Sequence, residues 1–375
     1  MGGSNGVKQF LKNKFLVNNM QNMQNKQNNQ NNQNNQEQQD NQEQQDNKEQ
    51  QDNQEQRDNQ CIKILKLQDL TDKLVAIDAS GFIYRAKNNF GVDKWWLEIF
   101  NFIQKFKYKV LFVFDGQPPP NKLTCIKKRK EREEKVEEKS NINNVKYIKN
   151  SIKLEDINKC KEVCDYLGIP YLHIETVEAD EIFPYLIECG IVDSVFSQDN
   201  DMIRRGCKNI YCDIDYNNNT ILKINYDLCL KQLNITREQF NNAYDLAGTD
   251  YNDNLEYCKF KDTIELIRIY GTIEKVLSNL DNINSGKIVR IIKSPKSFNF
   301  LKTREIFDRK LPESIIQEIN SKINNFQNKF NNIKFDIIEY GIKLFNKIEI
   351  ISGKDAYKYI KKVKSYYMDV FDLYL

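Results

Sequence analysis

The chain has 375 residues, 40% hydrophobic and 29% charged, with a formal net charge of +3, so it can bury a core in one large domain or two modest ones. No window approaches 18 uninterrupted apolar residues and the first residues hold no apolar segment, which argues against a transmembrane helix and a secretory signal. Nine scattered cysteines without a Cys-x-x-Cys pair, and a single histidine, argue against zinc sites and His-based catalysis and indicate reduced thiols in an intracellular protein.

Residues 18–60 form a polar tract in which 30 of 43 residues are Asn or Gln. Within it, 35–58 repeats one hexad four times, as NQEQQD, NQEQQD, NKEQQD and NQEQRD. Such a segment cannot bury enough apolar area to offset the entropy lost on ordering, so we predict a disordered insertion without chemistry. The tract carries a net charge of −5, which leaves +8 on the remainder and a mild bias toward polyanionic partners.

After the tract, apolar runs alternate with amphipathic ones. Near-continuous apolar strands separated by helices predict an α/β fold with a mostly parallel sheet covered on both faces. We expect His173, in the run PYLHIE, to be a core or sheet-edge residue. The predicted strands are 73–80, 109–116, 169–174, 191–199 and 209–212, and the predicted helices are 94–107, 155–167, 178–188, 236–248, 262–270, 272–280, 313–325 and 354–365.

Several carboxylates lie where these strands end. Asp78 ends VAID, Asp115 ends FVFD, and Asp199 follows the strand at 191–199. The carboxyl ends of strands are where open α/β sheets place their sites. Clustered carboxylates without histidine describe a site for a hard cation such as Mg²⁺ or Mn²⁺, and two such ions can activate a water and stabilise the leaving oxygen of a phosphodiester.

Each acid taken alone has an ordinary structural explanation. An Asp at a strand end can cap a loop, and Glu178 with Asp180 in VEAD can simply favour the start of a helix. The joint pattern favours the metal site.

Six motifs follow one another along the chain: the opening MGGSNGVKQFL, then VAIDASGFIY, FVFDGQPPPNK, LGIPYLHIETVEADE, SQDNDMIRRG and LAGTDY. In their order and spacing they resemble the flap endonuclease / xeroderma pigmentosum group G (XPG) family of structure-specific 5′ nucleases. The resemblance implies a PIN-like three-layer fold with a helix-turn-helix-type DNA-binding region. The implied metal ligands are Asp78, Asp115, Glu178, Asp180, Asp199, Asp201 and Asp250.

The resemblance also implies an activity. We expect a Mg²⁺-dependent DNA endonuclease of the 5′-flap type in replication, repair or recombination, with two Mg²⁺ ions per subunit that Mn²⁺ can replace. A 5′-3′ exonuclease or a junction resolvase of the same family, and a catalytically inactive DNA-binding scaffold, are the alternatives. Retention of all seven acids argues against the scaffold.

A basic segment follows Asp115: residues 121–135 carry a net charge of +4. Such a segment beside an acidic site can guide phosphates toward it, although a solvated charged helix explains the same pattern. By the resemblance, Lys122 and Arg129 act near the scissile phosphate as catalytic residues. The remaining expected DNA contacts are Lys127, Lys128, the aromatic Tyr84, for which core packing is the alternative, and Lys259 and Lys261.

The chain departs from the family pattern at two places. The turn EYCKFKDT at 256–263 has Tyr257 and Lys259 where the family has glycines, so close backbone approach to duplex phosphates is lost and side chains such as Lys261 would replace it. No sliding-clamp peptide ends the chain, which finishes SYYMDVFDLYL.

The predicted organisation has five segments. They are an amino-terminal nuclease motif at 1–17, the insertion at 18–60, a PIN-like nuclease core at 61–235, the helix-turn-helix-type region at 236–300 and a helical Lys/Asn-rich region of unassigned role at 301–375. We expect a monomer that binds branched or 5′-ended DNA and no membrane. An Asn/Lys/Ile-rich composition suggests a viral or protist genome, with the protein in the nucleus, the host nucleus or a viral factory.

Overall fold

The computed structural model describes residues 3–17, 60–71, 74–90, 109–120, 122–123, 127, 131, 152–167, 170–285 and 291–332. The predicted insertion at 18–60, except its last residue, and the predicted helices at 94–107 and 354–365 lie outside these residues. The chain divides into two compact units. We name the first the helical unit (Met1–Ile64, Lys208–Ile210, Leu222–Arg304) and the second the sheet unit (Leu65–Cys207, Tyr211–Ile221, Glu305–Leu375).

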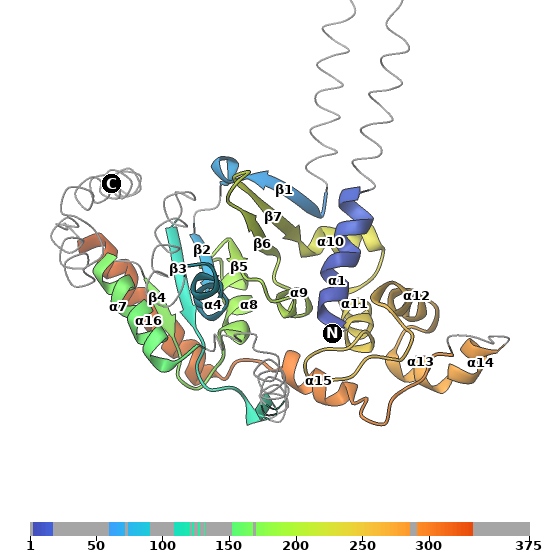
Figure 1. Ribbon diagram of the computed structural model, residues 1–375. Helices are drawn as coiled ribbons and strands as arrows, with labels where there is room; N and C mark the ends of the chain where they lie inside the picture. The colour runs from blue at the N-terminus through green and yellow to red at the C-terminus, as the bar shows by residue number, and fades with distance from the viewer. Residues whose placement is uncertain are drawn as a thin grey trace, which may run out of the picture. The chain divides into compact units, whose positions relative to one another are not determined.

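One seven-stranded sheet has the order β1-β7-β6-β5-β2-β3-β4 (Figure 1). In the sheet unit, β2 pairs in parallel with β3 and β5, and β3 pairs in parallel with β4. The central strands carry Val, Ile, Leu and Phe side chains that are buried on both faces, as parallel sheets require. The strands are β1 Ile62–Lys66, β2 Leu74–Asp78, β3 Lys109–Phe114, β4 Tyr171–His173, β5 Ser194–Phe196, β6 Asn209–Asp215 and β7 Thr220–Asn225.

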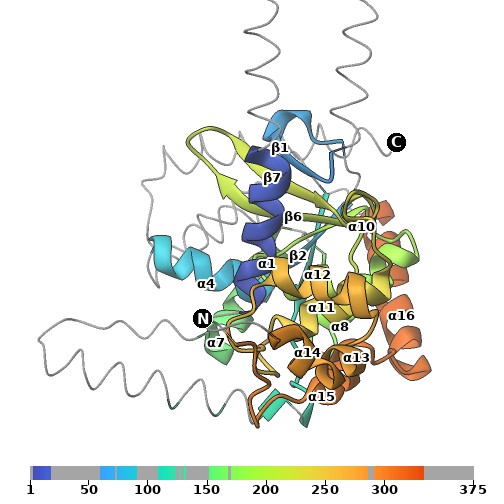
Figure 2. The same ribbon diagram turned by 90° about the vertical axis from the view of Figure 1, so that its right-hand side faces the viewer.

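Helices of the sheet unit follow its parallel strands along the chain. Figure 1 shows α7 and α16 beside β4, and Figure 2 shows α4 and α8 on different sides of β2, which both of them contact. This arrangement confirms the predicted α/β class with a mostly parallel sheet. The helices are α4 Ala79–Phe90, α7 Leu154–Leu167, α8 Ala179–Glu188, α9 Asp201–Arg204 and α16 Glu313–Asn332, while α15 Phe300–Phe307 runs across the boundary between the units.

The helical unit is built around aromatic side chains. The Phe260 ring lies 5.4 Å from that of Phe10 and 5.7 Å from that of Phe240, so the opening helix α1 packs on α12. The cap of α11 is a capping box, in which Thr236 and Gln239 each satisfy a backbone N–H of the other. The helices are α1 Gly3–Lys12, α10 Tyr226–Leu233, α11 Arg237–Leu246, α12 Phe260–Tyr270, α13 Ile273–Ser278 and α14 Leu280–Asn284, with a short π-helix at Asn13–Val17 and a 3₁₀ turn at Leu67–Asp69 in the other unit.

The described residues include no helix with the length and apolar character needed to cross a membrane. The five predicted segments of the chain remain predictions.

Candidate active site

Asp78 is the last residue of β2, and both of its carboxylate oxygens are held. Oδ1 accepts from the Gly81 backbone N–H at 2.9 Å, and Oδ2 accepts from the Ser197 hydroxyl at 2.8 Å. A Cβ at Gly81 would lie only 2.8 Å from Asp78 Oδ2, so a side chain at this position would push against the Asp78 carboxylate. Burial, and then repulsion from Asp115, raise the pKa of Asp78 to about 7.

Asp115 directly follows β3 and is tied to the start of α8. Its Oδ1 accepts from the Ala179 backbone N–H at 2.9 Å. The next residue, Gly116, donates its N–H to the Val177 carbonyl at 2.9 Å. A Cβ at Gly116 would lie 2.0 Å from the Ile174 carbonyl oxygen, so only glycine permits this approach. The close packing places Asp115 at the helix that carries the next group of acids.

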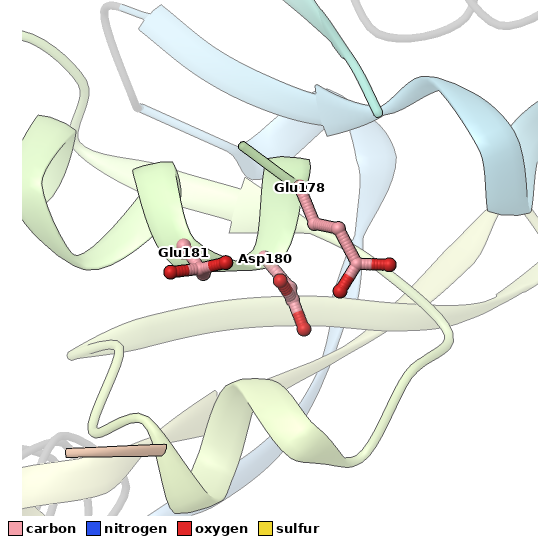
Figure 3. A group of neighbouring side chains, drawn as sticks. All are labelled: Glu178, Asp180 and Glu181. Carbon is pink, nitrogen blue, oxygen red and sulfur yellow. The ribbon is translucent and has the colours of Figure 1, made fainter. Parts of the chain in front are cut away.

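Three acids gather at the start of α8, as Figure 3 shows. Carboxylate oxygens of Glu178, Asp180 and Glu181 lie within 4.8 Å of one another. Burial, and then repulsion from Asp180, raise the pKa of Glu178 to about 7, and burial raises the pKa of Glu181. Asp180 Oδ1 is buried and has no hydrogen-bond partner. A buried anionic oxygen without a donor is costly, and a cation would satisfy it.

Each of these three acids also has a cation beside it. Lys122 Nζ lies 2.7 Å from Glu178 Oε2, and Arg205 Nη2 lies 3.1 Å from Asp180 Oδ2. The third pair is looser, with 3.9 Å between Arg309 Nε and Glu181 Oε2. The predicted residue Lys122 is therefore brought to the acidic group.

Asp199 and Asp201 are connected to Asp78 through Ser197. The Ser197 hydroxyl, which donates to Asp78, accepts from the Asp199 backbone N–H at 3.0 Å. Asp199 Oδ1 in turn accepts from the Asp201 N–H at 2.9 Å. Asp199 is exposed and Asp201 is buried at the first position of α9. Repulsion from Asp199 is also among the causes of the raised pKa of Asp78.

The other predicted residues are placed as follows. Asp250 is exposed and belongs to the helical unit, two residues after Gly248, which has a φ of 89°. Tyr84 of α4 is 52% exposed, so core packing does not explain it. Lys127 is exposed in the sheet unit, and Lys128 and Arg129 lie outside the described residues. Lys259 and Lys261 are exposed at the start of α12, just after Tyr257, which has a φ of 60°.

Sequence reasoning missed three residues of this site. Glu181 stands three residues after Glu178 and so returns to a nearby position on a helix, a spacing that could have identified it. Ser197 stands in the same SQDND motif as two predicted acids, yet its role depends on a contact with a residue 119 positions away. No sequence pattern pointed to Arg205, because its partner Asp180 lies on another helix. His173 of β4 is half-buried and lies 2.8 Å from Lys161 Nζ, in agreement with the expected sheet-edge position.

Two family models match this chain. The XPG N-terminal domain matches residues 53–136 and the XPG I-region matches residues 168–250. Together the two matched blocks contain all seven predicted acids. A flap endonuclease 1 from Methanosphaera stadtmanae is 28% identical over 247 residues, which cover 58% of this chain and 75% of the relative. One from Drosophila mojavensis is 30% identical over 217 residues, 53% of each protein, so the chain spans about half of that relative.

Solved structures show the same fold. The catalytic core of Rad2 in complex with a DNA substrate has a TM-score of 0.50 at 22% identity, over 71% of this chain and 82% of that one. The Holliday junction-resolving enzyme GEN1 in complex with product DNA and Mg²⁺ has a TM-score of 0.53 at 16% identity, over 76% and 70%. The two matched family domains and the flap endonuclease relatives confirm the resemblance of this chain to the XPG/flap endonuclease family of metal-dependent, structure-specific nucleases.

Proposed function

We propose that this protein is a Mg²⁺-dependent DNA endonuclease of the 5′-flap type that acts in replication, repair or recombination. One observation carries the proposal: strand ends and the start of α8 in the sheet unit bring acids from four separate motifs together. Hydrogen bonds and mutual repulsion connect Asp78, Asp115, Glu178, Asp180 and Asp199. We further propose that it works as a monomer in a nucleus or viral factory and binds branched or 5′-ended DNA.

The residues present fit a hard divalent cation. All the candidate donors are carboxylate oxygens, the ligands that Mg²⁺ prefers. One of them, Asp180 Oδ1, is buried without a partner, and two neighbouring carboxyl groups have pKa values raised to about 7 by burial and by other acids. Added positive charge would relieve both costs. We assign the binding of two Mg²⁺ ions, for which Mn²⁺ can substitute, to Asp78, Asp115, Glu178, Asp180, Asp199, Asp201 and Asp250.

The protein's own side chains would prepare the substrate. Bound Mg²⁺ supplies the charge that activates water and stabilises the leaving oxygen of the phosphodiester. Gly81 and Ser197 hold the Asp78 carboxylate in one orientation. Lys122 lies at the acidic group, where its ammonium can stabilise negative charge on the scissile phosphate, and we assign the same role to Arg129.

Other residues would bind the DNA away from the reacting atoms. Exposed Tyr84 can stack on a base, since every base offers an aromatic face. Phosphate contacts we assign to Lys127, Lys128, Lys259 and Lys261.

The test is cleavage by the purified full chain in Mg²⁺. Labelled 5′-flap, nicked, single-stranded and four-way substrates are compared under single-turnover conditions. The 5′ flap should be cut fastest, and Asp199→Asn or Asp201→Asn should lower its rate at least about a thousandfold while DNA affinity changes little.

A matched control lies at the other end of β5, the strand that Asp199 follows. Asp193, just before β5, accepts from the Leu74 backbone N–H at 3.0 Å, and Asn can accept there too. Asp193→Asn should therefore cleave like the wild type. Preferred cutting of four-way substrates, or stepwise release of nucleotides from a 5′ end, would replace the flap assignment by a resolvase or an exonuclease. Binding without any cleavage would favour the scaffold.

A further inference from the structure

Arg205 ends the turn of α9 and its guanidinium is buried against α8. Its side chain is 4% exposed, and its Nη2 lies 3.1 Å from Asp180 Oδ2. Its backbone N–H donates to the Asp201 carbonyl at 2.9 Å, so Arg205 stands one helical turn after another of the assigned acids. One oxygen of the Asp180 carboxylate is thereby fixed, while the other, Oδ1, is buried without a hydrogen-bond partner.

The ring of Phe307, the last residue of α15, packs against two arginines at the end of α9. The ring centroid lies 5.2 Å from the Arg205 guanidinium carbon and 5.1 Å from that of Arg204. Arg204 makes its own ion pair, with 2.9 Å between Nη1 and Asp308 Oδ1. The two adjacent arginines thus share burial and an aromatic neighbour; Arg205 is paired with Asp180 of the candidate site, and Arg204 with Asp308.

We propose that Arg205 is a positioning residue, which holds Asp180 Oδ2 so that Oδ1 faces the metal. The proposal rests on the proposed function. An Asp side chain has only two rotatable bonds, and a hydrogen bond from a planar, buried guanidinium restrains both. Phe307 keeps that guanidinium in place, which gives the otherwise unassigned segment after residue 300 a part in building the site.

The direct test measures metal binding by the full chain without DNA, through the electron paramagnetic resonance signal of unbound Mn²⁺. Arg205→Gln should weaken Mn²⁺ binding about 10- to 100-fold, the usual effect of removing a partner that orients a metal ligand. Arg204→Gln is the matched control: it also removes a buried guanidinium over Phe307, and it should leave Mn²⁺ affinity within about twofold. Arg205→Lys keeps the charge but not the planar fork, and should bind Mn²⁺ with intermediate affinity.

A second step tests whether Arg205 acts through Asp180. In an Asp180→Asn background, Arg205→Gln should produce no further loss of Mn²⁺ affinity, because the group that it orients is gone. Equal losses in the two backgrounds, equal effects of Arg204→Gln and Arg205→Gln, or tighter Mn²⁺ binding by Arg205→Gln would overturn the proposal. Tighter binding would mean that the guanidinium competes with the cation.

The design separates this proposal from the function on which it rests. Thermal unfolding of each variant shows whether it is folded; if Arg205→Gln is not, Arg205→Lys and Arg204→Lys are compared, and only the former should lose affinity. A wild type that binds no Mn²⁺ contradicts the metal site itself. A wild type that binds Mn²⁺ together with an unaffected Arg205 series contradicts only the role of Arg205.

Discussion

At the scale of single residues, Ser197 joins two acids although it carries no charge. Its hydroxyl donates to Asp78 Oδ2 and accepts from the Asp199 N–H, so one side chain fixes the orientation of a carboxylate and the path of the loop after β5. Ser197→Ala should raise the Mg²⁺ concentration needed for half-maximal cleavage about 10- to 100-fold, since Asp78 loses an orienting donor.

The measurement is the single-turnover rate on a 5′ flap over a range of Mg²⁺ concentrations. Ser194→Ala, three residues earlier and also buried, is the control and should leave the midpoint unchanged. A Ser197→Ala protein with the wild-type midpoint would show that the hydroxyl only shapes the loop.

Substitution of Lys122 tests whether the basic segment at 121–135 takes part in catalysis. Its ammonium lies 2.7 Å from Glu178, whereas Lys127, five residues later, is exposed. Lys122→Ala should lower the single-turnover rate about ten- to a thousandfold, the range for removing one electrostatic stabiliser, with a much smaller change in DNA affinity. Lys127→Ala should weaken affinity slightly and leave the rate at saturating enzyme unchanged. Identical behaviour of the two variants would reduce Lys122 to a general phosphate contact.

Individual residues of the site were predictable to the extent that their position follows from local chain order. Asp78, Asp115 and Asp199 could be grouped because parallel strands bring their carboxyl ends to one edge, as β2, β3 and β5 do. Ser197 and Arg205 could not, since each acquires its role from a side chain on a different element. The ion pair of Lys122 with Glu178, 56 positions apart, is likewise set by tertiary structure.

At the scale of elements, strands that are buried on both faces could be predicted from the sequence, and two partly exposed strands could not. The strands β2 and β3 are apolar on both faces and were predicted. By contrast, β1 (IKILK) and β7 (TILKIN) carry lysines at half-exposed or exposed positions, and neither strand was predicted. The helices α7, α8, α11, α12 and α13 lie within three residues of their predicted bounds, and threonine side chains cap the starts of two of them, Thr236 at α11 and Thr272 at α13.

The start of α12 provides a prediction about DNA binding. Asp262 caps this helix by accepting from the Lys259 N–H at 2.8 Å, which leaves the exposed Lys259 and Lys261 side chains to reach phosphates. The double variant Lys259→Ala/Lys261→Ala should weaken duplex binding, and the slope of log affinity against log salt should fall by about two units. Single-turnover cleavage at saturating enzyme should stay near wild type.

The control for this pair is Lys231→Ala, an exposed lysine on α10 of the same unit. It should leave the salt slope unchanged. If the double variant keeps the wild-type slope, the turn at 256–263 does not contact duplex DNA.

At the scale of the whole molecule, the proposed metal ligands and DNA contacts are divided unequally between the two units. Six of the seven proposed metal ligands belong to the sheet unit, and Asp250 and the α12 lysines belong to the helical unit. The order of motifs in the sequence was enough to predict the fold class and the family. The division of the chain was not predictable in the same way, because β1, β6 and β7 each contribute residues to both units.

The acidic cluster should also be visible in the stability of the whole protein. The pKa values of Asp78 and Glu178 are about 7, above their ordinary values of 3.8 and 4.5, because of burial and neighbouring acids. Between about pH 4 and pH 7 the folded protein therefore binds more protons than the unfolded chain. The stability contributed by these protonated carboxyls is complete below pH 4 and is lost as the pH rises through 7.

Calorimetry with a chelator present should accordingly show that Asp78→Asn, which stays neutral, has a Tm at least about 3 °C above the wild type at pH 8 and close to it at pH 5. Mg²⁺ should reverse the order at pH 8, because it stabilises the charged wild-type cluster by mass action and the variant has lost a ligand. Asp193→Asn, an exposed acid distant in sequence from Asp78, should follow the wild type throughout. If wild type and Asp78→Asn instead unfold at parallel temperatures from pH 5 to 8 without metal, Asp78 is ionised at little cost, and the cluster does not need a cation to offset its charge.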